Sequence, residues 1–122
     1  MAQMQKRRFD KPDETRKFDR GQVDLIKLGG ITFGRGTFHK GWKWSESVKP
    51  IVKTTSCEAP HLQYIVSGKM HVVMDDGIEA DFGAGDLVLV PPGHDAWIVG
   101  DKRCVILDFT GAAKYAQKAS PA

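Results

Sequence analysis

Residues 85–97 read GDLVLVPPGHDAW, and this stretch carries the strongest fold signal in the chain. Glycine and proline stand on either side of four apolar residues, at positions where they set backbone angles that most residues disfavour. Both flanks therefore indicate turns. Leu87–Val90 between them is apolar on both faces, which predicts a short β-strand that is covered on each side.

Short β-rich runs bounded by glycine continue in both directions from this stretch. Asp76-Gly77 is a strong hairpin signal, and we expect a type I′ turn, which needs positive φ at both central residues. No helical periodicity of useful length appears before residue 111. The pattern predicts an all-β sandwich or barrel. The predicted strands are Val23–Leu28, Ile31–Phe38, Trp42–Trp44, Leu62–Val66, Lys69–Met74, Glu79–Phe82, Leu87–Val90, Ala96–Val99 and Cys104–Phe109.

The 122 residues suit a single domain with one hydrophobic core. We divide the chain into a charged N-terminal extension (1–20), a β-barrel domain (21–112) and a C-terminal tail (113–122). Within the extension, Pro12-Asp13-Glu14 has the composition of a short helix start. The stretch Ser45–Pro60 lacks clean alternation and is predicted to be a loop across the barrel mouth.

The net charge of +3 and the pI of about 8.9 raise the question of an anionic partner. The basic side chains cluster in the extension and alternate with acids, so we interpret them as a solvated arm and expect no nucleic-acid partner. No apolar run approaches the roughly 18 residues of a membrane span, and no secretory signal stands out, so we expect a cytoplasmic protein without a membrane partner. Cys57 and Cys104 match no zinc or redox spacing and are expected to be free thiols, with a disulfide as the alternative.

The segment from Gly85 to Gly93 resembles the first half of the second conserved motif of the cupin superfamily, which reads Gly, five residues, Pro-x-Gly, two residues, His, three residues, Asn. Tyr64–Gly68 is similar to the end of the first cupin motif, and the hairpin lies between the two. This resemblance implies a double-stranded β-helix or jelly-roll barrel, commonly dimeric. It also implies a pocket that often holds a divalent metal through three histidines and one glutamate.

The positions of those four ligands hold other residue types here. His61 stands where the glutamate of the first motif would be, and Thr55 and Cys57 fall at its two histidine positions. Ala96 occupies the histidine position of the second motif. The chain is therefore similar to a subgroup of small single-domain cupins with degenerate metal-binding motifs, a resemblance that implies no particular activity.

Strand parity brings a different set of side chains into the barrel. Residues two apart share a face, so Gln63 lies on the face of His61, and His94 on that of Ala96. His61 and His94 are therefore candidates to meet inside the barrel, as catalytic residues or, with Cys57, as ligands of zinc or iron. Two other interpretations stay open: pocket-wall residues bonded to backbone or to Asp95, and a metal-free pair that transfers protons.

Three tryptophans complete the candidate site. Trp42 and Trp44 share a face by strand parity, and Trp97 follows the second motif. Together with Gln63 they are candidates for a ligand-binding wall, and a purely structural core role is the alternative.

The favoured function is binding of a small organic molecule in the barrel pocket. One alternative is a transition-metal-dependent isomerase, oxygenase or lyase that uses the His/Cys site, and another is a structural or regulatory module without a ligand. Whether the protein is an enzyme stays open. We also expect a homodimer, with Ile31–Phe38 or the N-terminal arm as interface elements.

Overall fold

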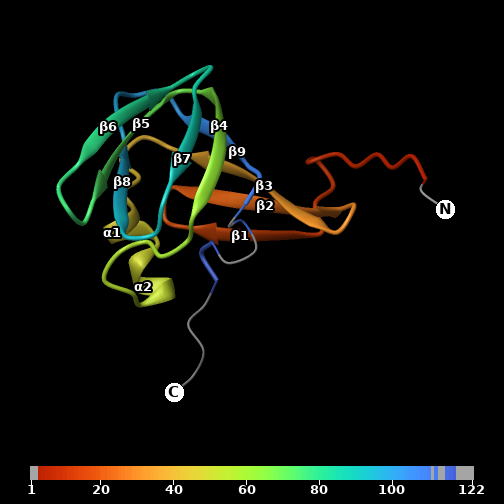
Figure 1. Ribbon diagram of the computed structural model, residues 1–122, viewed down its shortest axis with the longest axis horizontal. Coiled ribbons are helices and arrows are strands. Elements are labelled where there is room, and N and C mark those ends of the chain that lie inside the picture. The colour runs from red at the N-terminus through yellow and green to blue at the C-terminus, as the bar shows by residue number, and fades with distance from the viewer. Residues whose placement is uncertain (1–2, 111, 113–114, 118–122) are drawn as a thin grey trace.

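The computed structural model describes residues 3–110, 112 and 115–117. They form two antiparallel sheets with the strand orders β1-β2-β3-β9-β4-β7 and β6-β5-β8. The strands are β1 (Glu14–Phe18), β2 (Gly21–Leu28), β3 (Ile31–Phe38), β4 (His61–Ser67), β5 (Lys69–Met74), β6 (Glu79–Gly83), β7 (Leu87–Val90), β8 (His94–Ile98) and β9 (Cys104–Asp108). Two short helices, α1 (Trp44–Ser47) and α2 (Lys49–Val52), lie together at one end of the molecule (Figure 1).

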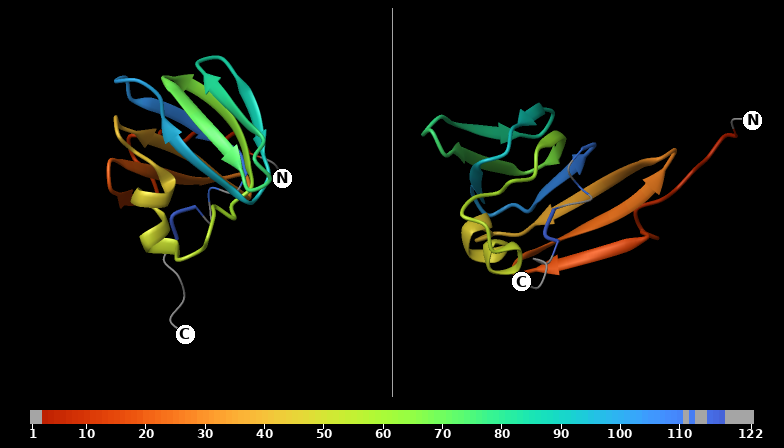
Figure 2. Two further views of the ribbon diagram at one scale, coloured as in Figure 1. Left: turned by 90° about the vertical axis from the view of Figure 1, so that its left-hand side faces the viewer. Right: turned by 60° about the horizontal axis from the view of Figure 1, so that its bottom comes forward.

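The two sheets face each other across one hydrophobic core (Figure 2). Burial of the side chains alternates along the strands. In β9, for example, Cys104, Ile106 and Asp108 are buried and the residues between them are half-buried. This two-residue period places every second side chain of a strand between the sheets. The all-β prediction is confirmed, and two facing antiparallel sheets agree with the double-stranded β-helix that the cupin resemblance implies. Within the described residues, no helix is long and apolar enough to cross a membrane.

Three predicted strands, β3, β5 and β7, match the structure residue for residue. The prediction of a strand at Trp42–Trp44 is wrong, because Trp44 begins α1 and only Lys43 makes a single bridge, to Trp97. The predicted loop Ser45–Pro60 contains the rest of α1 and all of α2, although both helices are only one turn long.

The predicted helix start at Pro12-Asp13-Glu14 is also wrong. Glu14–Phe18 is strand β1, which pairs antiparallel with β2 from Glu14 opposite Leu25 to Phe18 opposite Gly21. Pairing with a neighbouring strand satisfies more backbone groups than one helical turn would, so the tertiary context overrides the local preference. Part of the segment assigned to an extension therefore belongs to the sheet.

The hairpin at Asp76-Gly77 forms, but not as a type I′ turn. Of the residues in the turn only Gly77 has positive φ, at 92°. Its N–H donates to the carbonyl of Met74 at 2.9 Å, and the N–H of Met74 donates to the carbonyl of Ile78 at 2.8 Å. This is a turn closed by a glycine bulge, and Asp76 caps it by accepting a hydrogen bond from the Ile78 N–H at 3.0 Å.

Strand β7 is covered on one face, not on both as predicted. Val88 and Val90 are buried, whereas Leu87 and Leu89 are 69% and 74% exposed. The exposure of Leu87 and Leu89 shows that, in the described part of the chain, no element packs over the outer face of β7. The predicted interface strand β3 is paired on both edges, with β2 and β9, and offers no free edge.

The C-terminal tail lies partly outside the described residues. Residues 112 and 115–117 are described, and Ala112, Tyr115 and Ala116 are buried against the barrel. Both cysteines are free thiols, as predicted. Both are buried, and Cys104 has no exposed surface.

Candidate functional site

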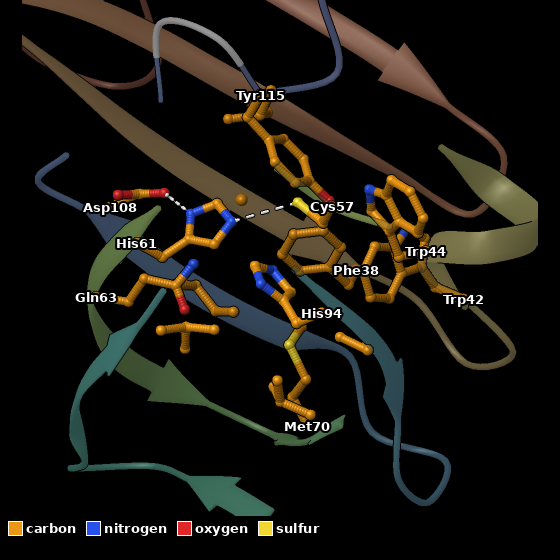
Figure 3. A pocket seen from close by; sticks show the side chains of 16 residues that line it. Phe38, Trp42, Trp44, Cys57, His61, Gln63, Met70, His94, Asp108 and Tyr115 are labelled. Atoms are coloured by element: carbon orange, nitrogen blue, oxygen red, sulfur yellow. Dashed lines mark hydrogen bonds and ion pairs between the residues drawn. The ribbon is translucent and has the colours of Figure 1, made fainter. Parts of the chain in front are cut away.

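A pocket between the two sheets gathers most of the predicted site residues (Figure 3). We call it the inner pocket. Its polar side chains are Cys57, His61, Gln63, His94 and Asp108, and its walls are otherwise mainly apolar. It leaves about 40 Å³ for the centres of water molecules. The inward positions that parity predicted for His61, Gln63, His94 and Ala96 are all found in its lining.

His61 begins β4 and is held by a carboxylate from the neighbouring strand. Its Nδ1 lies 2.7 Å from Oδ2 of Asp108, and both side chains are buried. The other oxygen of Asp108 accepts the backbone N–H of Thr110 at 3.0 Å, so the carboxylate is fixed on both sides. A carboxylate oxygen accepts hydrogen bonds, so Nδ1 is the ring nitrogen that His61 turns to Asp108, and Nε2 is the one that faces Cys57.

His94 begins β8 and is oriented in the same way by a different acceptor. Its Nδ1 lies 2.8 Å from the carbonyl oxygen of Pro91, which places the proton on Nδ1 and leaves Nε2 free. Burial lowers the pKa of His94, against the opposing effect of the Pro91 carbonyl, so its imidazole is neutral at physiological pH. The rings of His61 and His94 stand 5.3 Å apart, centroid to centroid.

Cys57 is the third member of the cluster. Its backbone bridges to His94, and its Sγ lies 3.8 Å from Nε2 of His61. Burial raises the pKa of the Cys57 thiol to about 12, so the thiol keeps its proton unless a cation binds to it. One potential ligand atom from each of Cys57, His61 and His94 lies within 4.8 Å of the others.

A protein-family model described as the EutQ-like cupin domain matches residues 34–105, more than half of the chain. The chain belongs to this cupin family. The match spans β3 to the start of β9 and so includes all three residues of the Cys57–His61–His94 cluster. None of the curated proteins compared with this cupin by sequence matches it.

Solved structures share the cupin fold at low sequence identity. A protein of unknown function from Rhizobium leguminosarum bv. viciae 3841 is 18% identical with a TM-score of 0.61, over 89% of this chain and 99% of that one. The polyketide cyclase RemF from Streptomyces resistomycificus is 14% identical with a TM-score of 0.60, over 87% and 78%. KdgF from Halomonas sp. is 16% identical with a TM-score of 0.56, over 80% and 86%. At these identities the likeness shows the fold alone.

The donor set of this cupin fits a divalent transition metal. Two neutral imidazoles and a thiol that becomes a thiolate on binding suit zinc or iron better than the hard ions magnesium and calcium. Each histidine also has the arrangement common in metal sites, in which the remote N–H donates to a carboxylate or a backbone carbonyl. Cys57, His61 and His94 are therefore the residues that would hold such a metal.

The three predicted tryptophans separate into two groups. Trp42 and Trp44 line the inner pocket, each 2% exposed, and the buried Nε1–H of Trp42 has no acceptor among the described residues. Trp97 does not line it. Its ring stacks on His71 at 4.8 Å, with Nζ of Lys43 lying 5.2 Å from the ring centroid. Strand parity accounts for this, because Ala96 points inward and Trp97 therefore points outward.

Among the pocket residues with polar groups, sequence reasoning missed two, Asp108 and Tyr115. Asp108 carried a usable signal, because it lies two and four residues beyond Ile106 and Cys104 on a predicted strand and so shares their inward face. Tyr115 carried none. It lies beyond the last strand in a segment without apolar periodicity, and only the way the chain folds back brings it to the pocket.

Proposed function

We propose that this cupin binds a small organic molecule in the inner pocket, and that a divalent transition metal held by Cys57, His61 and His94 forms the polar end of the binding site. One observation carries the proposal: both histidines are oriented through Nδ1, and each offers a ring nitrogen to the same buried cluster as the Cys57 sulfur. Two histidines that served only as pocket wall would not need this common orientation.

The chemistry available at the site follows from its residues. When bound, a metal of this class acts as a Lewis acid toward an oxygen of the ligand. The amide of Gln63, on the face of His61, can orient that ligand by hydrogen bonding. The apolar walls, which include Phe38, Met70 and Val72, exclude bulk water and strengthen polar interactions inside. Isomerase, oxygenase and lyase reactions all fit such a site.

The size of the inner pocket limits what it can hold as it stands. A water molecule needs about 10–15 Å³ on this measure, so 40 Å³ admits only a few water-sized groups. The part of the organic molecule that reaches the cluster is therefore a small head group, such as a carboxylate or a hydroxyketone.

Metal content and metal titration test the proposal. We expect the purified protein to bind zinc or cobalt(II) at one equivalent, with a cobalt spectrum that shows sulfur ligation. Cys57→Ser should remove the sulfur signature, and His94→Ala should lower the affinity by about tenfold or more. His71→Ala is the matched control, since His71 pairs with Asp81 on the outer side of β5. Equal metal binding by the wild type and the Cys57→Ser/His94→Ala double variant would refute the site.

A second candidate function rests on the 2.7 Å contact between His61 and Asp108. A buried histidine oriented by a carboxylate is an arrangement used for proton transfer without a metal. Ligand binding or turnover that is unchanged after exhaustive chelation, but lost in His61→Gln, would favour this function over the metal site.

A further inference from the structure

A second, larger pocket adjoins the inner pocket at the end of the molecule that carries α1 and α2. We call it the outer pocket. It lies between residues 52–59 and the C-terminal residues 115–117, and it leaves about 220 Å³ for the centres of water molecules. Trp44, Cys57 and Tyr115 line both pockets. The two pockets therefore adjoin each other at these three side chains.

Tyr115 is the one of these three that the C-terminal segment supplies. Its ring packs edge-on against His61 at 5.5 Å, Phe18 at 6.0 Å and Phe38 at 6.4 Å, centroid to centroid. It is 8% exposed and points into the inner pocket toward Cys57 (Figure 3). Trp44 begins α1 and Cys57 bridges to β8, so both belong to the barrel itself.

The described residues around Tyr115 are held by contacts other than strand pairing. None of these residues, 112 and 115–117, takes part in strand pairing. Arg16 donates a hydrogen bond to the carbonyl of Tyr115 at 2.8 Å. Ala112 packs closely against Gly34. A side chain at position 34 would bring a Cβ to within 2.8 Å of the Cβ of Ala112. Moving a side chain that is held in this way costs less free energy than unfolding the sheets.

We propose that Tyr115 is the gate between the two pockets, and that a ligand reaches the metal-binding cluster through the outer pocket when Tyr115 moves aside. With the ring displaced, the two spaces join into one site that holds a longer molecule: a polar head beside His61 and a body in the outer pocket. Thr54, Glu58 and Gln117 give the outer pocket hydrogen-bonding groups, and the carboxylate of Glu58 disfavours an anionic body. The identity of the ligand that passes Tyr115 rests on the proposed function. The movement of Tyr115 itself does not.

Alkylation of Cys57 measures the gate without any ligand or metal. The protein is treated with iodoacetamide in the presence of a chelator, and the modification of Cys57 and Cys104 is followed separately by peptide mass spectrometry. Cys104 lines neither pocket and is fully buried, so it reports general loosening of the fold. We expect Tyr115→Ala to raise the Cys57 rate by at least about tenfold while the Cys104 rate is unchanged. Tyr115→Phe keeps the ring and should react like the wild type.

Two further variants make the test decisive. A chain that ends at Thr110 should expose Cys57 as Tyr115→Ala does. Ala59→Phe added to Tyr115→Ala places a ring in the outer pocket and should return the Cys57 rate toward the wild-type value. An unchanged Cys57 rate in Tyr115→Ala, or a parallel rise at Cys104, would overturn the gate. Failure of metal binding would leave these rates unaffected, so the two proposals fail separately.

Discussion

Nδ1 of His61 and Oδ2 of Asp108 lie 2.7 Å apart on neighbouring strands of the larger sheet, and both residues are buried. In the β4–β9 register Asp108 lies opposite Gln63, which is two residues after His61 on β4. The carboxylate therefore reaches His61 diagonally across the two strands. This contact determines which ring nitrogen of His61 is free for a ligand.

Asp108→Asn is expected to weaken metal binding by about 10- to 100-fold, because an amide orients the imidazole less strongly and no longer supports its basicity. Competition with a coloured chelator measures the affinity. Asp81→Asn is the matched control, since Asp81 contacts Nδ1 of His71 at 2.6 Å in a similar histidine–aspartate pair on the surface. An affinity loss in Asp81→Asn as large as in Asp108→Asn would contradict the assigned role.

Metal affinity is expected to rise with pH across the neutral range. Burial raises the pKa of Cys57 to about 12 and lowers that of His94, so between these two values the thiol holds a proton and the imidazole does not. Binding through the thiolate then releases one proton, which corresponds to about a tenfold gain in affinity per pH unit. Zinc competition at several pH values measures the slope, and Cys57→Ala should flatten it. A wild-type affinity independent of pH would argue against thiolate ligation.

Gly34→Ala is expected to displace the C-terminal segment from a distance. The new Cβ would lie 2.8 Å from the Cβ of Ala112 and 3.3 Å from Cγ2 of Val23, so one neighbour has to move. We expect a loss of about 1–3 kcal/mol in the free energy of unfolding, together with faster Cys57 alkylation. Chemical denaturation and the alkylation assay measure the two effects. Gly83→Ala, whose Cβ meets nothing closer than 3.9 Å, is the control and should change neither.

The outer side of β4 and β7 is expected to bury its apolar side chains against a second copy of the chain. Tyr64 pairs with Leu87 and Leu62 with Leu89 in the sheet register, and Tyr64, Val66, Leu87 and Leu89 are all exposed. Contiguous apolar surface of this kind favours association, and one copy offers another the same face. Leu87→Lys/Leu89→Lys should shift a dimer to monomer in sedimentation velocity. Ile78→Lys, at the exposed hairpin tip, is the control and should leave the dimer intact. Equal sedimentation of the two variants would contradict this interface.

The strands were largely predictable from the sequence, and so were several of the residues that line the inner pocket. Short β-rich runs bounded by turn residues defined β3, β5 and β7 to the residue, and parity predicted the inward positions of His61, Gln63 and His94. The predicted cover over both faces of β7 failed at Leu87 and Leu89, because an apolar side chain does not reveal whether a second layer covers it.

By itself the sequence determined the local properties of this protein: which runs are strands, where they turn, and which side chains share a face. These depend on neighbours along the chain and on the two-residue period of a strand. The tertiary structure alone decided that β1 joins the sheet, that Asp108 lies beside His61 and that Tyr115 lines the pocket. Such contacts join residues up to about a hundred positions apart, and their energy comes from packing and hydrogen bonds that exist only once the chain has folded.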